Sequence, residues 1–140
     1  MFAPKIKLAN HLSRLRLADL FLDTWPYNAH TTASDALWVG LPVLTLTGKS
    51  FASRVAGSLL HAVGMPEMVT RTSDEYVELA IRLGNSSTIV RALSDKLKAH
   101  VHTAALFDAP LTCRHIEAAF TQVWERYQRS ESPQSITLSN

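Results

Sequence analysis

Residues 28–35, Asn-Ala-His-Thr-Thr-Ala-Ser-Asp, have the residue types and spacing of a phosphate-binding site. They follow an apolar run and open a predicted helix, whose first N–H groups and dipole favour a negative charge. His30, Thr31 and Thr32 add side-chain donors in the first turn. Asp35, one turn further on, is placed to accept a hydrogen bond from a sugar hydroxyl. This pattern predicts binding of a phosphate-bearing ligand.

Ordinary helix capping explains the same residues in another way. Thr31 or Thr32 would then be the N-cap, because a threonine hydroxyl accepts a hydrogen bond from the first turn. Asp35 would be favoured there by the helix dipole. From the residues alone, phosphate binding and simple capping both remain open.

The N-terminal segment is basic, although the whole chain has a net charge of only +2, which does not indicate a nucleic-acid partner. Four cations precede the first acidic residue, Asp19, with His11 among them. An anionic ligand would be attracted here, but charge alone favours a solvated helix face. The four cations are Lys5, Lys7, Arg14 and Arg16.

Three other patterns lack the residues that their chemistry needs. The tripeptide at 48–50, Gly-Lys-Ser, resembles the end of a P-loop, but Val43 stands where that motif needs its first glycine. His100 and His102 would point to different faces of a helix, with no third ligand nearby, so we expect no metal site. Cys113 has no partner motif, and a G-x-S-x-G serine-hydrolase elbow is absent from the sequence.

Apolar patterning predicts an α/β domain with a parallel sheet. Buried strands are expected at 20–22 and 43–46, and Phe2 and Ala3 look like the end of an earlier strand whose beginning lies upstream of Met1. Helical spacing predicts the following segments: 8–15, His30 or Thr31 to 40, 52–63, 73–84, 87–101 and a last helix after Pro110 that includes 116–127. So few strands suggest the later part of a larger doubly wound domain.

Length and composition fit one folded, intracellular domain. The chain has 140 residues, of which 46% are apolar and 19% are charged. A single cysteine excludes an internal disulfide framework and favours a cytoplasmic location. No apolar run approaches the roughly 20 residues of a membrane span. We expect the lobe to occupy residues 1–128, and the polar residues 129–140 to form a frayed tail.

Several segments carry a family resemblance beyond these general features. They are 2–4 (Phe-Ala-Pro), 17–24 (Leu-Ala-Asp-Leu-Phe-Leu-Asp-Thr), 27–38 (Tyr-Asn-Ala-His-Thr-Thr-Ala-Ser-Asp-Ala-Leu-Trp), 40–45 (Gly-Leu-Pro-Val-Leu-Thr), 51–56 (Phe-Ala-Ser-Arg-Val-Ala) and 106–108 (Leu-Phe-Asp), with His11 and Arg14. Together they resemble the C-terminal catalytic lobe of O-linked N-acetylglucosamine transferases, glycosyltransferase family 41. The resemblance covers residues 2–127.

The resemblance implies a fold and a donor site. The fold would be a Rossmann-like C-terminal lobe of a GT-B glycosyltransferase, with a partial parallel sheet followed by a helical C-terminal tail. The family's pattern implies that the residues His30, Thr31 and Thr32 hold a diphosphate, and that Asp35 binds the ribose. It places the remaining contacts on the N-terminal segment: His11 beside the uridine, the backbone at Ile6 on the uracil edge, and Arg14 on the face of His11.

The chain departs from the family pattern at one position and lacks several family parts. Animal members have a lysine three residues before the histidine that matches His11, and Leu8 stands there, so Lys5 or Lys7 would contact the phosphate or ribose instead. The other GT-B lobe, the repeats that present acceptor proteins and a catalytic lysine are expected upstream of Met1. Catalytic residues within the chain are therefore unknown, and the isolated chain is expected to be weak or inactive.

The resemblance implies inverting, metal-independent transfer of N-acetylglucosamine from UDP-GlcNAc to Ser or Thr of proteins, with no cofactor. The partners would be the UDP-sugar donor, the acceptor proteins and the missing lobe, without nucleic acid or membrane. Two alternatives stay open: a SPINDLY-like protein O-fucosyltransferase that uses GDP-fucose, and a truncated non-catalytic module that binds a nucleotide or a partner.

Overall fold

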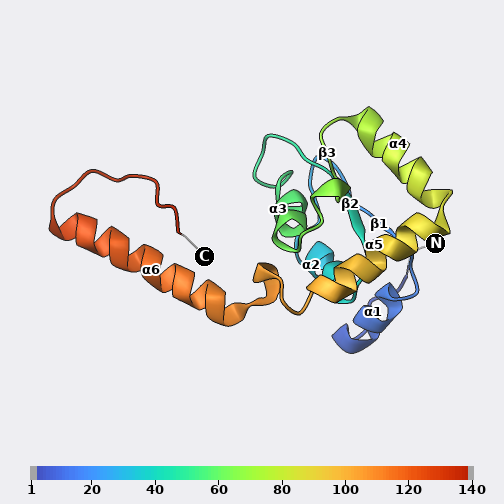
Figure 1. Cartoon of the computed structure of the whole chain (residues 1–140), viewed down its shortest axis with the longest axis horizontal. Coiled ribbons are helices and arrows are strands. Elements are labelled where there is room, and N and C mark those ends of the chain that lie inside the picture. The colour runs from blue at the N-terminus through green and yellow to red at the C-terminus, as the bar shows by residue number, and fades with distance from the viewer. Residues whose placement is uncertain (1–2, 139–140) are drawn as a thin grey trace.

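The computed structural model describes residues 3–138 and contains a small parallel sheet surrounded by helices (Figure 1). Its elements, in chain order, are α1 (Leu8–Leu15), β1 (Phe21–Leu22), α2 (Thr31–Trp38), β2 (Val43–Leu46), α3 (Val55–Ala62), the 3₁₀ turn η1 (Pro66–Met68), β3 (Val69–Thr70), α4 (Ser73–Gly84), α5 (Ser87–His100), the 3₁₀ turn η2 (Ala105–Phe107) and α6 (Ala109–Gln128).

The three strands are parallel in the order β1-β2-β3. Phe21 pairs with Val43 on one side of β2, and Thr45 pairs with Val69 on the other. All four residues of β2 are buried, as expected for a central parallel strand. The expectation that 20–22 is equally buried is wrong, because β1 is an edge strand and its Leu22 is 55% exposed.

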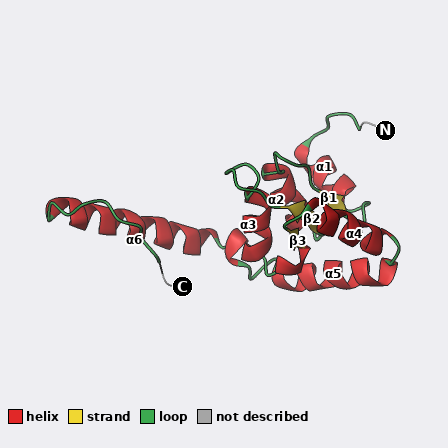
Figure 2. Ribbon diagram, turned by 90° about the horizontal axis from the view of Figure 1, so that it is seen from above, coloured by secondary structure: helices red, strands yellow, loops and turns green. Residues whose placement is uncertain are grey.

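The core forms where helices cover both faces of β2. Figure 2 shows α1 and α2 on one side of the strands and α5 on the other. The fully buried leucines come from the sheet and from four different helices, so the predicted apolar faces of these helices point inward. These leucines are Leu37, Leu44, Leu60, Leu83 and Leu97.

Most predicted elements are confirmed to within a residue or two. The helix expected at 52–63 begins only at Val55, because Ser50 and Ser53 bond to each other and hold the preceding residues in turns. Gly64, with φ of +73°, ends this segment as predicted. The two-residue strand β3 is too short to produce a sequence period and was not predicted.

The two ends of the chain add little to this core. Of the strand end expected at Phe2 and Ala3, Phe2 lies outside the described residues and Ala3 is in a loop. Helix α6 starts at a cap in which Asp108 accepts from the Leu111 N–H, and it projects away from the sheet (Figure 1). Among residues 3–138, no helix combines the length and apolar character needed to cross a bilayer.

A buried carboxylate, Asp23, ties three elements together at the end of β1. It is 6% exposed, and its Oδ2 accepts a hydrogen bond from the Thr45 hydroxyl of β2 at 2.6 Å. Its Oδ1 accepts from the backbone N–H groups of Thr24 at 2.8 Å and Ala29 at 2.7 Å. The Tyr76 hydroxyl of α4 donates to the Asp23 carbonyl at 2.9 Å. The carboxylate is therefore the polar centre from which the loop between β1 and α2 is built.

Replacing Thr45 by valine tests this centre. Thr45→Val removes one hydrogen bond and leaves a buried carboxylate oxygen without its donor, so the free energy of unfolding should fall by about 1.5–3 kcal/mol. Urea unfolding followed by circular dichroism measures the change. Thr88→Val, at an exposed position of α5, is the matched control. Equal stability of the two variants would contradict a structural role for the bond.

Tyr76 makes the stability of the fold pH-dependent at alkaline pH. Burial, and then the nearby charge of Asp23, raise the pKa of Tyr76 above its ordinary value of 10.0. The raised pKa means that the folded state holds this proton more tightly than the unfolded state, so its contribution is complete below pH 10 and is lost above it.

Tyr76→Phe should therefore be less stable than wild type at pH 7, because its hydrogen bond to Asp23 is missing. The difference should be constant up to about pH 9 and should shrink as the pH rises above about 10, where wild type loses this contribution. Urea midpoints measured across that range provide the comparison, with the exposed Tyr127→Phe as control. A pH-independent difference would show that the Tyr76 hydroxyl is not involved.

Candidate functional site

The loop between β1 and α2 lies at the carboxyl end of the sheet, where open α/β sheets bind ligands. Besides Asp23, the buried Asn28 fixes its course, since the Asn28 side-chain amide donates to the carbonyls of Thr24 at 3.0 Å and Leu46 at 3.3 Å. Thr24 in turn donates from its hydroxyl to the Tyr27 carbonyl at 2.7 Å. These hydrogen bonds hold the loop at both ends, so the segment that leads into α2 has a defined conformation.

The N-terminus of α2 has no side-chain cap. Its N-cap residue is His30, and neither its own side chain nor any other accepts from the first turn. Thr31 and Thr32 follow the cap as exposed residues of that turn. The capping explanation of the two threonines is therefore wrong, because capping would require one of them at the position of His30. The positive end of the α2 dipole therefore remains available for an anion.

The imidazole of His30 is held by aromatic neighbours and leaves one nitrogen unpaired. Tyr27 stacks on it with ring centroids 5.1 Å apart and planes 17° apart. Phe51 meets it edge-on at 6.1 Å. The Nε2 atom of His30 is buried and has no hydrogen-bond partner. Since buried polar atoms are normally hydrogen-bonded, this nitrogen marks a place for a polar ligand atom.

A hollow of about 540 Å³ lies against this helix end. His30, Thr31 and Thr32 all line it, together with Asp23 and other residues of the loop. Its volume falls in the range of small-molecule sites, about 300–1,000 Å³. Asp35 does not line this hollow; it lies half-buried one turn further along α2. Three of the predicted site residues are thus brought together.

The predicted residues of the N-terminal segment form a second group around α1. Arg14 and His11 are in contact, with Arg14 Nη2 3.2 Å from His11 Nδ1. Arg14 Nη1 also donates to the carbonyl of Pro4 at 3.1 Å and so ties the segment to the helix. Lys5, Ile6 and Lys7 are exposed in this segment. None of these residues lines the hollow at α2, although α1 packs beside α2.

Two residues that position this site, Asp23 and Asn28, were not predicted. Asp23 directly follows the apolar run of β1, and Asn28 lies shortly before the start of α2. Both are buried. A polar residue directly after a strand was the available signal, but the sequence cannot show that it turns inward.

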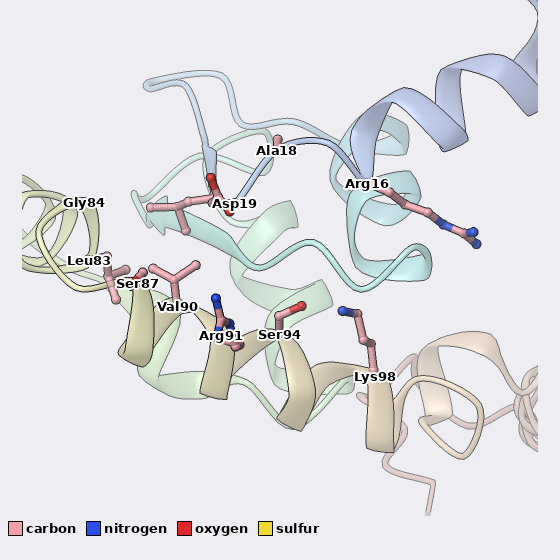
Figure 3. Close-up of a pocket in the computed structure, with 11 residues that line it drawn as sticks. Arg16, Ala18, Asp19, Leu83, Gly84, Ser87, Val90, Arg91, Ser94 and Lys98 are labelled. Atoms are coloured by element: carbon pink, nitrogen blue, oxygen red, sulfur yellow. The ribbon is translucent and has the colours of Figure 1, made fainter.

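A separate hollow of about 410 Å³ lies at the opposite edge of the sheet, beside the segment that enters β1 (Figure 3). Arg91, Ser94 and Lys98 of α5 line one side of it, and Arg16 and Asp19 line the other. Within residues 3–138, no three His, Cys, Asp or Glu side chains gather where they could hold a metal ion. Polar side chains therefore line hollows at both edges, but the N-terminus of α2 and the unpaired Nε2 of His30 belong to the first.

Comparison with known proteins places most of the chain in one family. Residues 1–116 match the model of glycosyl transferase family 41. The chain is 40% identical over 127 residues to UDP-N-acetylglucosamine--peptide N-acetylglucosaminyltransferase of Caenorhabditis elegans, a match that covers 91% of this chain and 11% of the relative. It is 36% identical over 131 residues to the probable enzyme SEC of Arabidopsis thaliana, covering 93% of this chain and 13% of that one.

The fold is also found in a solved structure. A mutant O-GlcNAc transferase of Thermobaculum terrenum superposes with a TM-score of 0.79 at 33% identity, over 88% of this chain and 24% of that one. The expected Rossmann-like lobe of a GT-B transferase, with a partial parallel sheet and a helical tail, is confirmed. The chain spans only about an eighth of the curated relatives, 11% and 13% of their lengths. By its family match, the chain belongs to glycosyltransferase family 41.

Proposed function

We propose that this chain is the donor-binding part of a protein O-linked N-acetylglucosamine transferase that uses UDP-GlcNAc. The observation that carries the proposal is the uncapped N-terminus of α2 beside the unpaired Nε2 of His30. His30 and the first residues of α2 line a hollow at the carboxyl edge of the sheet, where this class of fold binds nucleotides. The names of the relatives, which specify UDP-N-acetylglucosamine, support the choice of donor over GDP-fucose.

The diphosphate would bind at the start of α2. The first N–H groups of a helix are directed out of its N-terminus, and Thr31 and Thr32, which line the hollow, offer hydroxyl donors there. His30 would donate from Nε2 to a phosphate oxygen, with its ring held by Tyr27. Asp35 lies one turn further along α2 than His30, and it would accept a hydrogen bond from a ribose hydroxyl.

The nucleoside would extend toward α1. His11 would contact the uridine, and the backbone at Ile6 would read the uracil edge. Arg14 supports this arrangement because it bonds both to His11 and to the segment that carries Ile6. Lys5 or Lys7, exposed in the same segment, would add a contact to the phosphate or ribose.

This arrangement supplies one part of the transfer reaction. When an acceptor hydroxyl attacks the sugar with inversion, negative charge develops on the departing diphosphate. The dipole of α2 and the His30 donor would stabilise that charge without a metal or another cofactor. The other lobe, the repeats that present acceptor proteins and the catalytic lysine would have to come from outside these 140 residues. We place residues 1–128 in the donor lobe, residues 129–140 in a tail, and the protein in the cytoplasm.

Removing the imidazole tests the phosphate contact. His30→Ala should weaken UDP binding by about 1.5–3 kcal/mol, the loss expected for a hydrogen bond to a charged group. Calorimetric titration measures the change, with GDP as a parallel ligand for wild type. His102→Ala, at an exposed position after α5, is the matched control. Unchanged affinity of the His30 variant would reject this contact, and preference for GDP would favour fucosyl transfer.

A comparison of two ligands tests Asp35. Asp35→Asn should weaken binding of UDP about threefold to tenfold, since a hydrogen bond with the ribose is worth about 1 kcal/mol. Inorganic pyrophosphate, which has no ribose, should bind wild type and variant equally. An equal loss for both ligands would indicate damage to α2 rather than a missing ribose contact.

A further inference from the structure

A larger hollow lies at the same edge of the sheet, beyond the ends of β2 and β3. Its volume is about 930 Å³, at the upper end of the range for small-molecule sites. Leu46 and Val69 form part of its floor, and Trp25, from the loop after β1, lines it beside the donor hollow. Trp25 is 60% exposed, so an apolar surface is open to a ligand here.

The charged side chains that line this hollow are all positive. Among the described residues that line it, Lys49, Arg54 and Arg71 are cationic and none is acidic. All three are exposed, and neither of the two ion pairs found within residues 3–138 involves them. The hollow in Figure 3 differs in this respect, because Asp19 lies there among its cations. A concave surface whose charged lining residues are all cationic concentrates anions.

The backbone that carries these cations is held in place. A Cβ on Gly48 would lie 2.5 Å from Ser53 Oγ, so the turn before Lys49 closes tightly on Ser53. Ser53 also bonds to Ser50, and this fixes the approach to Arg54, the N-cap of α3. The N–H of Arg71 donates to the carboxylate of Glu75 at 2.8 Å, as part of the start of α4. The backbone positions that carry the three cations around this opening are therefore defined.

We infer that this cationic hollow, with Lys49, Arg54 and Arg71 at its rim, receives the acceptor polypeptide and favours segments whose reactive Ser or Thr is flanked by Asp or Glu. The inference rests on the proposed function, because sugar transfer needs the acceptor at the same edge as the donor. The donor diphosphate has its own donors at α2, which leaves these cations for another anionic group. A strand-like peptide advances about 3.3 Å per residue, so a hollow of this size accommodates several residues.

The test is binding of a labelled peptide to the 140-residue chain with UDP present. The peptide contains one Ser among Asp and Glu residues, and a second peptide has Asn and Gln in their place. Fluorescence anisotropy compares wild type with Lys49→Gln, Arg54→Gln, Arg71→Gln and the triple variant. Arg91→Gln, in the hollow of Figure 3, removes the same charge at the other edge and is the matched control. Circular dichroism verifies folding of each variant.

Each single variant should bind the acidic peptide about two- to fivefold more weakly, and the triple variant at least tenfold more weakly, with the loss reduced at high salt. The neutral peptide should bind weakly to all proteins, and Arg91→Gln should resemble wild type. UDP affinity should be the same in all variants.

Several results would overturn the inference. They are equal binding of the acidic and neutral peptides, an equal effect of Arg91→Gln, competition between UDP and the peptide, and displacement of the peptide by a short single-stranded oligonucleotide at lower concentration than by unlabelled peptide. Failure of the donor proposal looks different: wild type would not bind UDP, while its preference for the acidic peptide and the effects of the three cations would persist.

Discussion

The buried carboxylate of Asp23 is the interaction on which the rest of this lobe depends. A carboxylate in an apolar core is costly unless each oxygen is hydrogen-bonded, and here β2 and the β1–α2 loop supply the donors. Because Thr45 lies on the central strand, the hydrogen bond from its hydroxyl anchors the β1–α2 loop to the most buried part of the sheet. The Ala29 N–H bond then sets where α2 begins. The need of the Asp23 carboxylate for hydrogen-bond donors thus fixes the start of α2.

The functional features follow from that position. With the loop fixed, α2 starts at His30, its first turn stays uncapped, and an imidazole nitrogen remains without a partner. Two buried polar atoms without a hydrogen-bond partner, Asn28 Oδ1 and His30 Nε2, therefore lie at this edge of the sheet. The cations at Lys49, Arg54 and Arg71 belong to the same edge but to a different opening. On our proposals, this separation would give the donor phosphate and an acidic acceptor segment independent binding groups.

The sequence predicted those parts of the structure that depend on local patterns. Strand β2 and helix α1 have the predicted bounds, since a continuous apolar run and a one-sided apolar stripe are unambiguous. The missed parts depend on tertiary contacts. Strand β3 is too short for a period, and the inward turn of Asp23 exists only once Thr45 is beside it. For the site, spacing indicated an anion at His30, but the assignment of nucleotide parts came from family resemblance.

Backbone amide shifts during titration of the ¹⁵N-labelled chain with UDP test the donor site at α2, because they report which helix end binds the ligand. We expect saturable shifts that are largest for the N–H groups of Thr31 and Thr32, with smaller ones around His11. Residues of α5 such as Arg91 should not respond. Shifts centred on the hollow between Arg16 and Lys98, with none at the start of α2, would contradict this placement of the donor site.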